Sequence, residues 1–279
     1  MRLGGPIFKK YTNPQEWVVA MQSYNYRAAY CPVSLDASDD VIQAYVNAAA
    51  EANIVIAEVG AWSNPLSPDP VEREAALTKC KRSLQLADKI GARCCVNITG
   101  SRGNKWDGPS PLDLTEETFD MIVTTTQDII DAVNPICTAF ALETMQWSYP
   151  DSPDCYLRLI QAIDRKALAA HLDPVNLVNS PERYFHNSVL IRDCFAKLGP
   201  HIKSCHAKDI TLGSKGQVHL DEVRPGLGGL DYATYLQELD SSDPDTPLML
   251  EHLPDEQEYA LAAEYIRGVA ARVGVKTLS

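Results

Sequence analysis

Four short apolar stretches of the chain each end on a single polar residue: AFALE (139–143), LAAHLD (168–173), IKSCH (202–206) and LMLE (248–251). These polar residues, called the quartet below, are of types that bind metal ions: Glu143, Asp173, His206 and Glu251. By subtraction they lie 30, 33 and 45 residues apart, and each interval fits one strand–helix–strand step of about 30 residues or more. The sequence therefore predicts four successive parallel strands that present the quartet at one mouth of a barrel.

The rest of the chain continues the alternation of short apolar strands with longer segments whose apolar residues recur every three to four positions. We predict eight strands, at Leu3–Phe8, Arg27–Cys31, Ile54–Val59, Ala92–Ile98, Cys137–Glu143, Ala167–Asp173, Ile202–His206 and Pro247–His252. We predict eight helices, at Pro14–Tyr24, Ser38–Ala52, Pro70–Ile90, Thr115–Val133, Pro153–Asp164, Asn187–Leu198, Asp231–Leu239 and Asp255–Arg272. Cap signals support the helices; for example, Asp69 precedes a helical pattern and Gly91 follows it.

This alternation predicts an α/β fold. Eight strand–helix units close naturally into a (β/α)8 TIM barrel, which typically takes about 250 residues. The chain of 279 residues is therefore expected to form a single barrel domain, residues 1–279. A doubly wound open sheet is the main competitor, but it would normally carry a glycine-rich phosphate loop after its first strand, and Gly4-Gly5 is too short and too early.

Composition and charge argue against several classes of protein. The net charge of −12 and the pI near 4.9 lack the basic balance of a nucleic-acid binder. No stretch is long and apolar enough to span a membrane, and the N-terminus lacks the apolar core of a secretory signal. The eight cysteines form no CxxC motif, which is typical of reduced thiols. We therefore expect a cytoplasmic protein that binds neither nucleic acid nor membrane.

The quartet is compatible with a single pocket, because strand side chains alternate between the barrel interior and the helix layer. Counting back by two from Glu143 gives Ala141 and Ala139, which are small enough for a barrel interior. Three carboxylates and one imidazole form an oxygen-rich set that suits Mn²⁺ or Mg²⁺ and admits Co²⁺ or Zn²⁺. Strand ends are often polar without any function, but four such residues on consecutive strands favour a metal site.

The quartet lies in motifs that resemble the xylose-isomerase-like family of sugar phosphate isomerases and epimerases, which shares its barrel with endonuclease IV. The resemblance covers essentially the whole chain and is firmest in five motifs: ALET (141–144), HLDPVN (171–176), SCHAKD (204–209), RPGLGGLD (224–231) and LMLEH (248–252). It implies that the quartet holds a divalent ion and that Glu143 and Glu251 also act as the acid/base pair on opposite faces of the substrate. Asn176 stands where ketose 3-epimerases and endonuclease IV usually carry a histidine, which argues against both specificities.

Other residues near predicted strand ends are candidates for substrate contacts: His171, Lys208, Glu58, Asn97, Arg224, Trp106 and Trp147. His171 is one interior layer below Asp173 and is equally compatible with a buried, hydrogen-bonded role. Lys208 is expected to point toward the quartet, and a salt bridge at the rim is the alternative. The tryptophans could stack on a sugar ring or a planar aglycone, or pack loop against loop. His252 is expected to point away from Glu251.

The resemblance implies a metal-dependent enzyme of carbohydrate metabolism. We predict a sugar isomerase or epimerase that removes a proton alpha to a carbonyl and forms a metal-stabilised enediolate, with Mn²⁺ as the first choice of ion. The alternative is a metal-dependent lyase on keto-sugars, either an inosose- or dehydroshikimate-type dehydratase or the barrel subunit of a 3-keto C-glycoside deglycosidase. A sugar-binding protein without turnover would be expected to lack a ligand, and none is missing. The expected partner is a small sugar or keto-sugar, and a homo-oligomer or a small partner subunit is compatible with the resemblance.

Overall fold

Eight parallel strands close into a barrel in the spatial order β1-β10-β7-β6-β5-β4-β3-β2. The computed structural model describes residues 1–278. The barrel strands are β1 (Arg2–Gly4), β2 (Ala28–Tyr30), β3 (Val55–Gly60), β4 (Cys94–Asn97), β5 (Phe140–Glu143), β6 (Leu168–Leu172), β7 (Ile202–Ala207) and β10 (Pro247–Leu250). The first strand pairs with the last, from Arg2 opposite Pro247 to Gly4 opposite Met249, so the barrel is closed. The predicted TIM barrel is confirmed.

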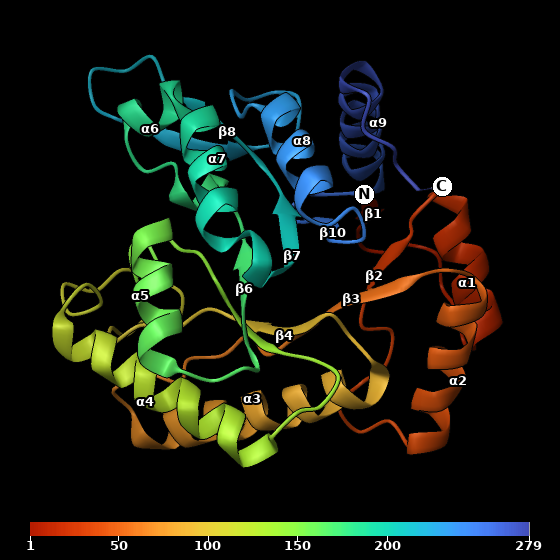
Figure 1. Cartoon of the computed structure of the whole chain (residues 1–279), viewed down its shortest axis with the longest axis horizontal. Coiled ribbons are helices and arrows are strands. Elements are labelled where there is room, and N and C mark those ends of the chain that lie inside the picture. Colours follow the sequence, from red (N-terminus) through yellow and green to blue (C-terminus); the bar gives the residue numbers. More distant parts are fainter. Residues whose placement is uncertain (279) are drawn as a thin grey trace.

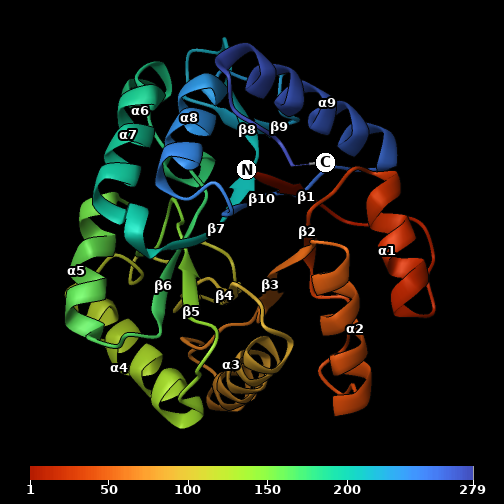
Figure 2. The same cartoon turned by 45° about the vertical axis from the view of Figure 1, so that its right-hand side comes forward.

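Helices surround the barrel strands on the outside (Figures 1 and 2). They are α1 (Pro14–Ser23), α2 (Asp39–Glu51), α3 (Pro70–Ile90), α4 (Glu116–Val133), α5 (Pro153–Ile163), α6 (Pro181–Phe185), α7 (Asn187–Leu198), α8 (Tyr232–Ser242) and α9 (Glu256–Val273). The sequence sets their ends: the Asp69 side chain accepts hydrogen bonds from the first amides of α3, and Gly91 ends that helix at φ 69°, a conformation that favours glycine. None of the helices formed by residues 1–278 has both the length and the apolar character that crossing a membrane requires.

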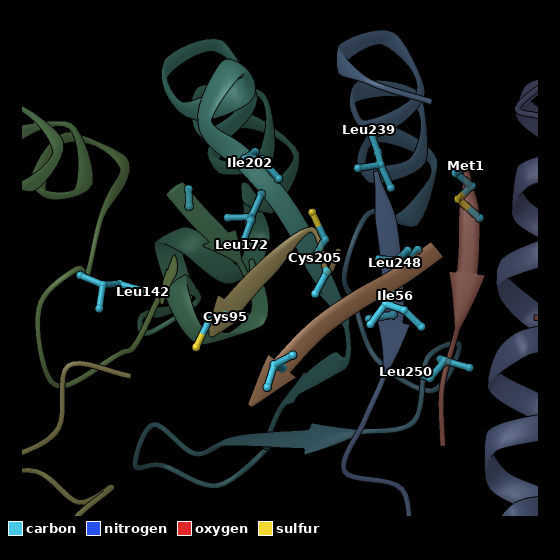
Figure 3. Close-up of a cluster of buried hydrophobic side chains, with 14 of the residues drawn as sticks. Met1, Ile56, Cys95, Leu142, Leu172, Ile202, Cys205, Leu239, Leu248 and Leu250 are labelled. Atoms are coloured by element: carbon cyan, nitrogen blue, oxygen red, sulfur yellow. The ribbon is translucent and has the colours of Figure 1, made fainter. Parts of the chain in front are cut away.

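The two faces of the barrel strands pack in different ways. Small or slender side chains fill the interior in two buried clusters: Cys94, Val96, Ala139, Ala141 and Ala169 in one, and Ala28, Ala57 and Met249 in the other. The main core lies between the strands and the helices, and Figure 3 shows part of it, including Leu142 and Leu250. The predicted alternation around Glu143 is therefore confirmed, because Ala139 and Ala141 face the interior while Leu142 faces the helix layer.

An antiparallel hairpin that the sequence analysis does not predict follows β7. It consists of β8 (Asp209–Leu212) and β9 (Leu220–Val223). The Asp209 carboxylate anchors the next loop by accepting hydrogen bonds from the amides of Gly226, Gly228 and Leu230 at 2.9, 3.0 and 2.9 Å. A Cβ on Gly228 would lie 2.2 Å from that carboxylate, which explains the glycine at this place in RPGLGGLD. The 3-10 turns η1 (Val175–Leu177) and η2 (Gly199–His201) and the short α6 are further additions.

Most of the predicted strands are longer than the observed ones, and the first and the fifth are two examples. The first strand ends at Gly4 rather than Phe8, because Pro6 has no amide hydrogen to donate to a neighbouring strand. The fifth begins at Phe140, and Cys137 is exposed ahead of it. Both differences leave the quartet at the carboxyl ends of its strands.

Candidate metal centre

The quartet comes together at the carboxyl ends of β5, β6, β7 and β10. Glu143 ends β5 and His206 lies in β7, while Asp173 and Glu251 directly follow β6 and β10. One ligand atom of each residue lies within 4.8 Å of those of the other three. His206 Nδ1 is 2.9 Å from Glu251 Oε1 and 3.1 Å from Glu143 Oε1. The same nitrogen is 3.9 Å from Asp173 Oδ2. Atoms at these separations can share one ion, because ligand bonds to such ions measure about 2.0–2.6 Å.

A second group of metal-ligating residue types lies deeper in the barrel and shares His206 with the quartet. We call Glu58, His171 and His206 the lower triad. His206 Nε2 is 3.2 Å from Glu58 Oε1, and His171 Nε2 is 2.8 Å from Glu58 Oε2. All three residues are at most 1% exposed. The two ring nitrogens of His206 therefore face different carboxylates, Nδ1 those of the quartet and Nε2 that of Glu58.

A β-bulge turns Glu58 into the barrel. Ala29 of β2 pairs with Ile56, but Tyr30 pairs with Glu58, so Ala57 is an extra residue on β3. Because a bulge interrupts the regular alternation of side chains, Ile56 packs in the outer core while Glu58, two residues later, contacts the interior histidines. Glu58 is a predicted substrate contact, and His171 is predicted either to contact substrate or to be a buried, hydrogen-bonded residue. In the structure both lie beneath the quartet, and Glu58 contacts His206 from behind. A carboxylate in this position typically orients the imidazole of a metal-binding histidine.

Burial and mutual charge set the protonation of the quartet in the metal-free protein. Burial favours a higher pKa for Glu143 and Glu251, but His206 beside both carboxylates outweighs it and holds each pKa below its usual range. For His206, burial favours a lower pKa, yet the surrounding glutamates raise the pKa well above its ordinary value. Burial also raises the pKa of Asp173 to about 6, although Lys208 opposes this shift. The surrounding carboxylates therefore favour the charged form of His206, and His206 favours the ionised form of Glu143 and Glu251.

The donor set fits a dication. Asp173 Oδ2 and Glu251 Oε1 are buried and accept no well-directed hydrogen bond from any of residues 1–278. Lys208 Nζ lies 2.8 Å from the first and 3.2 Å from the second, and His206 Nδ1 lies 2.9 Å from the second, so both oxygens are near nitrogen atoms but accept no well-directed hydrogen bond from them. Buried carboxylate oxygens left in this way are costly, and ligation to a cation satisfies them. Three carboxylates with one imidazole suit Mn²⁺ or Mg²⁺ and admit Co²⁺ or Zn²⁺.

A cavity of about 600 Å³ opens above the quartet, within the range of about 300–1,000 Å³ that is typical of small-molecule sites. Of the quartet, Glu143 and Glu251 line this cavity, whereas Asp173 and His206 are 0% exposed behind them. A groove of about 680 Å³ between α7 and α8 is larger but has no quartet residue in its lining. The cavity above the quartet is therefore the candidate site.

Glu143 and Glu251 form the floor of this cavity, and two walls of different chemistry border it. The aromatic wall consists of tryptophans from the loops after β3, β4 and β5: Trp62, Trp106 and Trp147. The polar wall comes from the residues that follow β7 and β10 and from β9: Lys208, His252 and Glu222. Further lining residues include Tyr30, Gln146, Asn176 and Tyr259. Of the predicted substrate contacts, Trp106, Trp147 and Lys208 thus line the cavity.

A family model described as the xylose isomerase-like TIM barrel matches residues 20–269. The chain belongs to this family. No curated protein matches the chain.

Solved structures that resemble the chain share its whole barrel at low identity. A D-psicose 3-epimerase of Clostridium cellulolyticum H10, solved with D-tagatose, is 13% identical over 99% of this chain and 100% of that one, with a TM-score of 0.70. The probable 3-DHS dehydratase AsbF of Bacillus anthracis is 14% identical over 96% and 98%, with a TM-score of 0.71. A xylose isomerase-like TIM barrel protein of Mycobacterium smegmatis, in complex with magnesium, is 16% identical over 96% and 91%, with a TM-score of 0.66. Identities this low show a shared fold and leave the reaction open.

In this member of the family, Asn176 occupies the place where the resemblance leads one to expect a histidine. Its side-chain amide donates to Glu143 Oε1 at 3.2 Å, and its oxygen accepts from Lys208 Nζ at 3.1 Å. Lys208 Nζ also lies 3.5 Å from Glu222 Oε2. Asn176 and Lys208 therefore connect the floor of the cavity to the polar wall.

Two residues predicted to contact substrate face away from the cavity, which corrects the sequence analysis. Asn97 exchanges hydrogen bonds with the backbone of Ser63 at 3.2 Å in each direction and so holds the loop after β3. Strand alternation explains this, because Val96 faces the barrel interior and Asn97 must then face the helices. Arg224 Nε donates to Glu258 Oε2 at 2.8 Å and ties the loop after β9 to α9.

His252 is a third correction, because it points toward Glu251 rather than away from it. Its Nε2 is 3.5 Å from Glu251 Oε2, and its Nδ1 is 3.2 Å from Glu222 Oε1. The backbone of His252 is left-handed, with φ 58°, so the alternation of β10 no longer applies. Sequence reasoning also missed Tyr30 and Tyr259. Of these residues, only Tyr30 could have been predicted to face the cavity by strand alternation, because it ends β2 two residues after the inward-facing Ala28.

Proposed function

We propose that the protein is a divalent-metal-dependent sugar isomerase or epimerase, with Mn²⁺ as its ion, that moves a proton on a carbon alpha to a carbonyl. The observation that carries this proposal is the division of the quartet between cavity and interior. Glu143 and Glu251 border the cavity, whereas Asp173 and His206 are sealed behind them. Carboxylates that can reach a substrate can act as base and acid, while the sealed pair can only hold an ion.

A dication held by the quartet would draw electron density from the substrate carbonyl and so make the neighbouring proton easier to remove. Glu143 is the proposed base, since its depressed pKa keeps it ionised at neutral pH. The Asn176 side-chain amide donates a hydrogen bond to Glu143 Oε1, which holds that carboxylate in place at the floor of the cavity. As Glu143 takes the proton, the electrons of the C–H bond move to the carbonyl oxygen. Glu251, which first takes up a proton from water because its own pKa is held low, then protonates carbon on the opposite face for epimerisation. In an isomerisation it protonates the adjacent carbon, whose hydroxyl proton moves to the former carbonyl oxygen, and Glu143 releases its proton to water.

A second candidate keeps the first step and changes the outcome. Once the proton alpha to the carbonyl has left, the electrons can instead expel a group from the beta carbon, which makes the protein a lyase on keto-sugars. The aromatic wall is the observation in favour of it, because Trp62, Trp106 and Trp147 offer a surface for a bulky leaving group beside the two glutamates.

Metal analysis with an activity screen tests the proposal. Metal-stripped protein should bind about one Mn²⁺ per chain and should then convert at least one member of a panel of ketohexoses, inososes and 3-keto-glycosides. Changed stereochemistry with the carbon skeleton retained identifies the isomerase or epimerase, and loss of water or an aglycone identifies the lyase. Failure to bind a divalent ion would rule out both.

The matched variant is Glu143→Gln, which keeps the side-chain volume and removes the basic carboxylate. It should lower kcat by about 10²–10⁴-fold, the usual contribution of a general base. Turnover at the wild-type rate would remove Glu143 from the mechanism.

A further inference from the structure

Every tryptophan outside the main core lines the cavity. The chain has four tryptophans, and Trp17 is 0% exposed in the core. Trp62 and Trp106 are 36% and 37% exposed in the aromatic wall, and Trp147 is half-buried there. Indole surface left open to water in a concave wall favours being covered by an apolar partner. The wall is therefore suited to a ligand with a flat, apolar part.

The charges around the floor leave no excess positive charge for an anionic ligand. Four carboxylates contribute −4, namely Glu143, Asp173, Glu222 and Glu251. A fifth, Asp107, also lines the cavity and is paired with Lys105 at 3.1 Å, so it adds no net charge. Lys208 adds +1 and a bound dication +2, which gives −1, and a protonated His252 would raise the sum only to zero. The two arginines in the rim loops are paired with glutamates, Arg102 with Glu117 at 2.9 Å and Arg224 with Glu258 at 2.8 Å. A phosphate or carboxylate on the substrate would find no free cation here.

The polar wall offers a different kind of contact. Glu222 accepts hydrogen bonds, and the Lys208 ammonium and the His252 imidazole can donate them, as neutral sugar hydroxyls require. The aromatic wall is formed by loops after β3 to β5 and the polar wall by residues of β9 and those after β7 and β10. The two walls therefore belong to different sectors of the barrel mouth, and the two glutamates of the floor belong to β5 and the end of β10.

We infer that the substrate is an uncharged keto-sugar that carries an aromatic aglycone, with the sugar over Glu143 and Glu251 and the aromatic ring against the aromatic wall. This rests on the proposed function, because the same two glutamates perform the chemistry on the sugar. It excludes sugar phosphates and acidic cyclitols as substrates, and it makes the aglycone a determinant of affinity.

Binding of four probes to the Mn²⁺-loaded protein tests the inference, with tryptophan fluorescence and saturation-transfer NMR as readouts. The probes are methyl β-D-glucopyranoside, phenyl β-D-glucopyranoside, phenyl β-D-glucuronide and D-glucose 6-phosphate. The phenyl glucoside should bind about tenfold or more tightly than the methyl glucoside, since ring burial and stacking both contribute. Each anionic probe should bind more weakly than the phenyl glucoside by a similar factor. Equal affinity for the two neutral probes, or tighter binding of the phosphate, would overturn the inference.

Variants of the wall connect the effect to these residues. Trp106→Ala and Trp147→Ala should each reduce the preference for the phenyl probe by several-fold, and Trp106→Phe should retain part of it, because a smaller ring still stacks. Phe185→Ala is the control, since Phe185 is an exposed aromatic residue on α6 that does not line the cavity. Loss of the preference in the control, or its full retention in both alanine variants, would contradict the assignment to the wall.

Failure of this inference is distinguishable from failure of the proposed function. A protein that binds no Mn²⁺ contradicts the function itself. A protein that binds Mn²⁺ and loses turnover in Glu143→Gln, yet shows no preference for the phenyl probe, contradicts only the substrate class.

Discussion

The quartet and the lower triad share His206 and use similar residue types, yet they differ in charge and in access. The quartet combines three carboxylates with one imidazole and meets a cavity through Glu143 and Glu251. The triad combines one carboxylate with two imidazoles and is sealed, since Glu58 and His171 are at most 1% exposed. A hard dication needs anionic oxygen ligands and a route of entry. Only the quartet provides both, so the comparison teaches that clustering of ligand types alone does not identify a metal site.

The comparison also gives each ring nitrogen of His206 a separate task. Nδ1 faces Glu143 and Glu251, and Nε2 lies 3.2 Å from Glu58 Oε1. A histidine that binds a metal through one nitrogen commonly donates the proton on the other to a carboxylate, which fixes its tautomer and orientation. We therefore expect the ion at Nδ1 and regard Glu58 as a positioning residue.

Neutralising a carboxylate of the quartet should have the largest effect. Asp173→Asn keeps the side-chain shape and can keep the hydrogen bond that Asp173 Oδ1 accepts from the Val175 amide, but it removes one negative ligand. We expect the Mn²⁺ affinity of metal-stripped protein, measured by titration calorimetry, to fall by about 100-fold or more, or about 2.8 kcal/mol. His171→Gln in the lower triad is the matched control and should change the affinity by less than about tenfold. Equal losses in the two variants would contradict the placement of the ion in the quartet.

Removing the charge behind His206 should have an intermediate effect. Glu58→Gln can still accept a hydrogen bond from His206 Nε2 but no longer holds the imidazole with a negative charge. We expect the Mn²⁺ affinity to fall by about 10–100-fold, the range seen for such outer partners. The same calorimetric titration measures it, and the nitrogen chemical shifts of His206 report which tautomer is present. An unchanged affinity with an unchanged tautomer would show that Glu58 does not position the ligand.

Acidification by one pH unit should lower the Mn²⁺ affinity less than either substitution does, because protons only compete with the ion for the ligand atoms. The pKa of His206 is raised well above its ordinary value, so at neutral pH the metal-free imidazole must lose a proton to bind. Between pH 8 and pH 6 the Mn²⁺ affinity should therefore fall by up to about tenfold per pH unit. Below pH 6 the decline should steepen, since the pKa of Asp173 is about 6. Titrations in buffers of different ionisation enthalpy should detect at least one proton released per ion, and a pH-independent affinity would contradict this account.

The barrel and the quartet could be predicted because they depend on patterns within single strands. Ala139 and Ala141 before Glu143 fix its direction by simple alternation, and the spacing of the quartet matches one strand–helix unit per step. The family match extends over residues 20–269, in agreement with a resemblance that covers the whole chain.

The residues around the quartet could not be predicted where the backbone departs from regular geometry. The extra residue Ala57 in β3 turns Glu58 inward, and the left-handed backbone of His252 brings its ring back to Glu251. Neither feature has a signature in the sequence. Asn97 differs, because alternation alone placed it on the outer face, and counting from Val96 would have excluded it.

The central claim is that a dication binds in the quartet through His206 Nδ1. A crystal of the protein grown with Mn²⁺, with an anomalous difference map measured near the manganese absorption edge, tests it most directly. This account predicts one strong peak about 2.0–2.6 Å from His206 Nδ1 and from oxygens of Glu143, Asp173 and Glu251. A peak bound by His206 Nε2 between Glu58 and His171, or no peak at either group of residues, would contradict it.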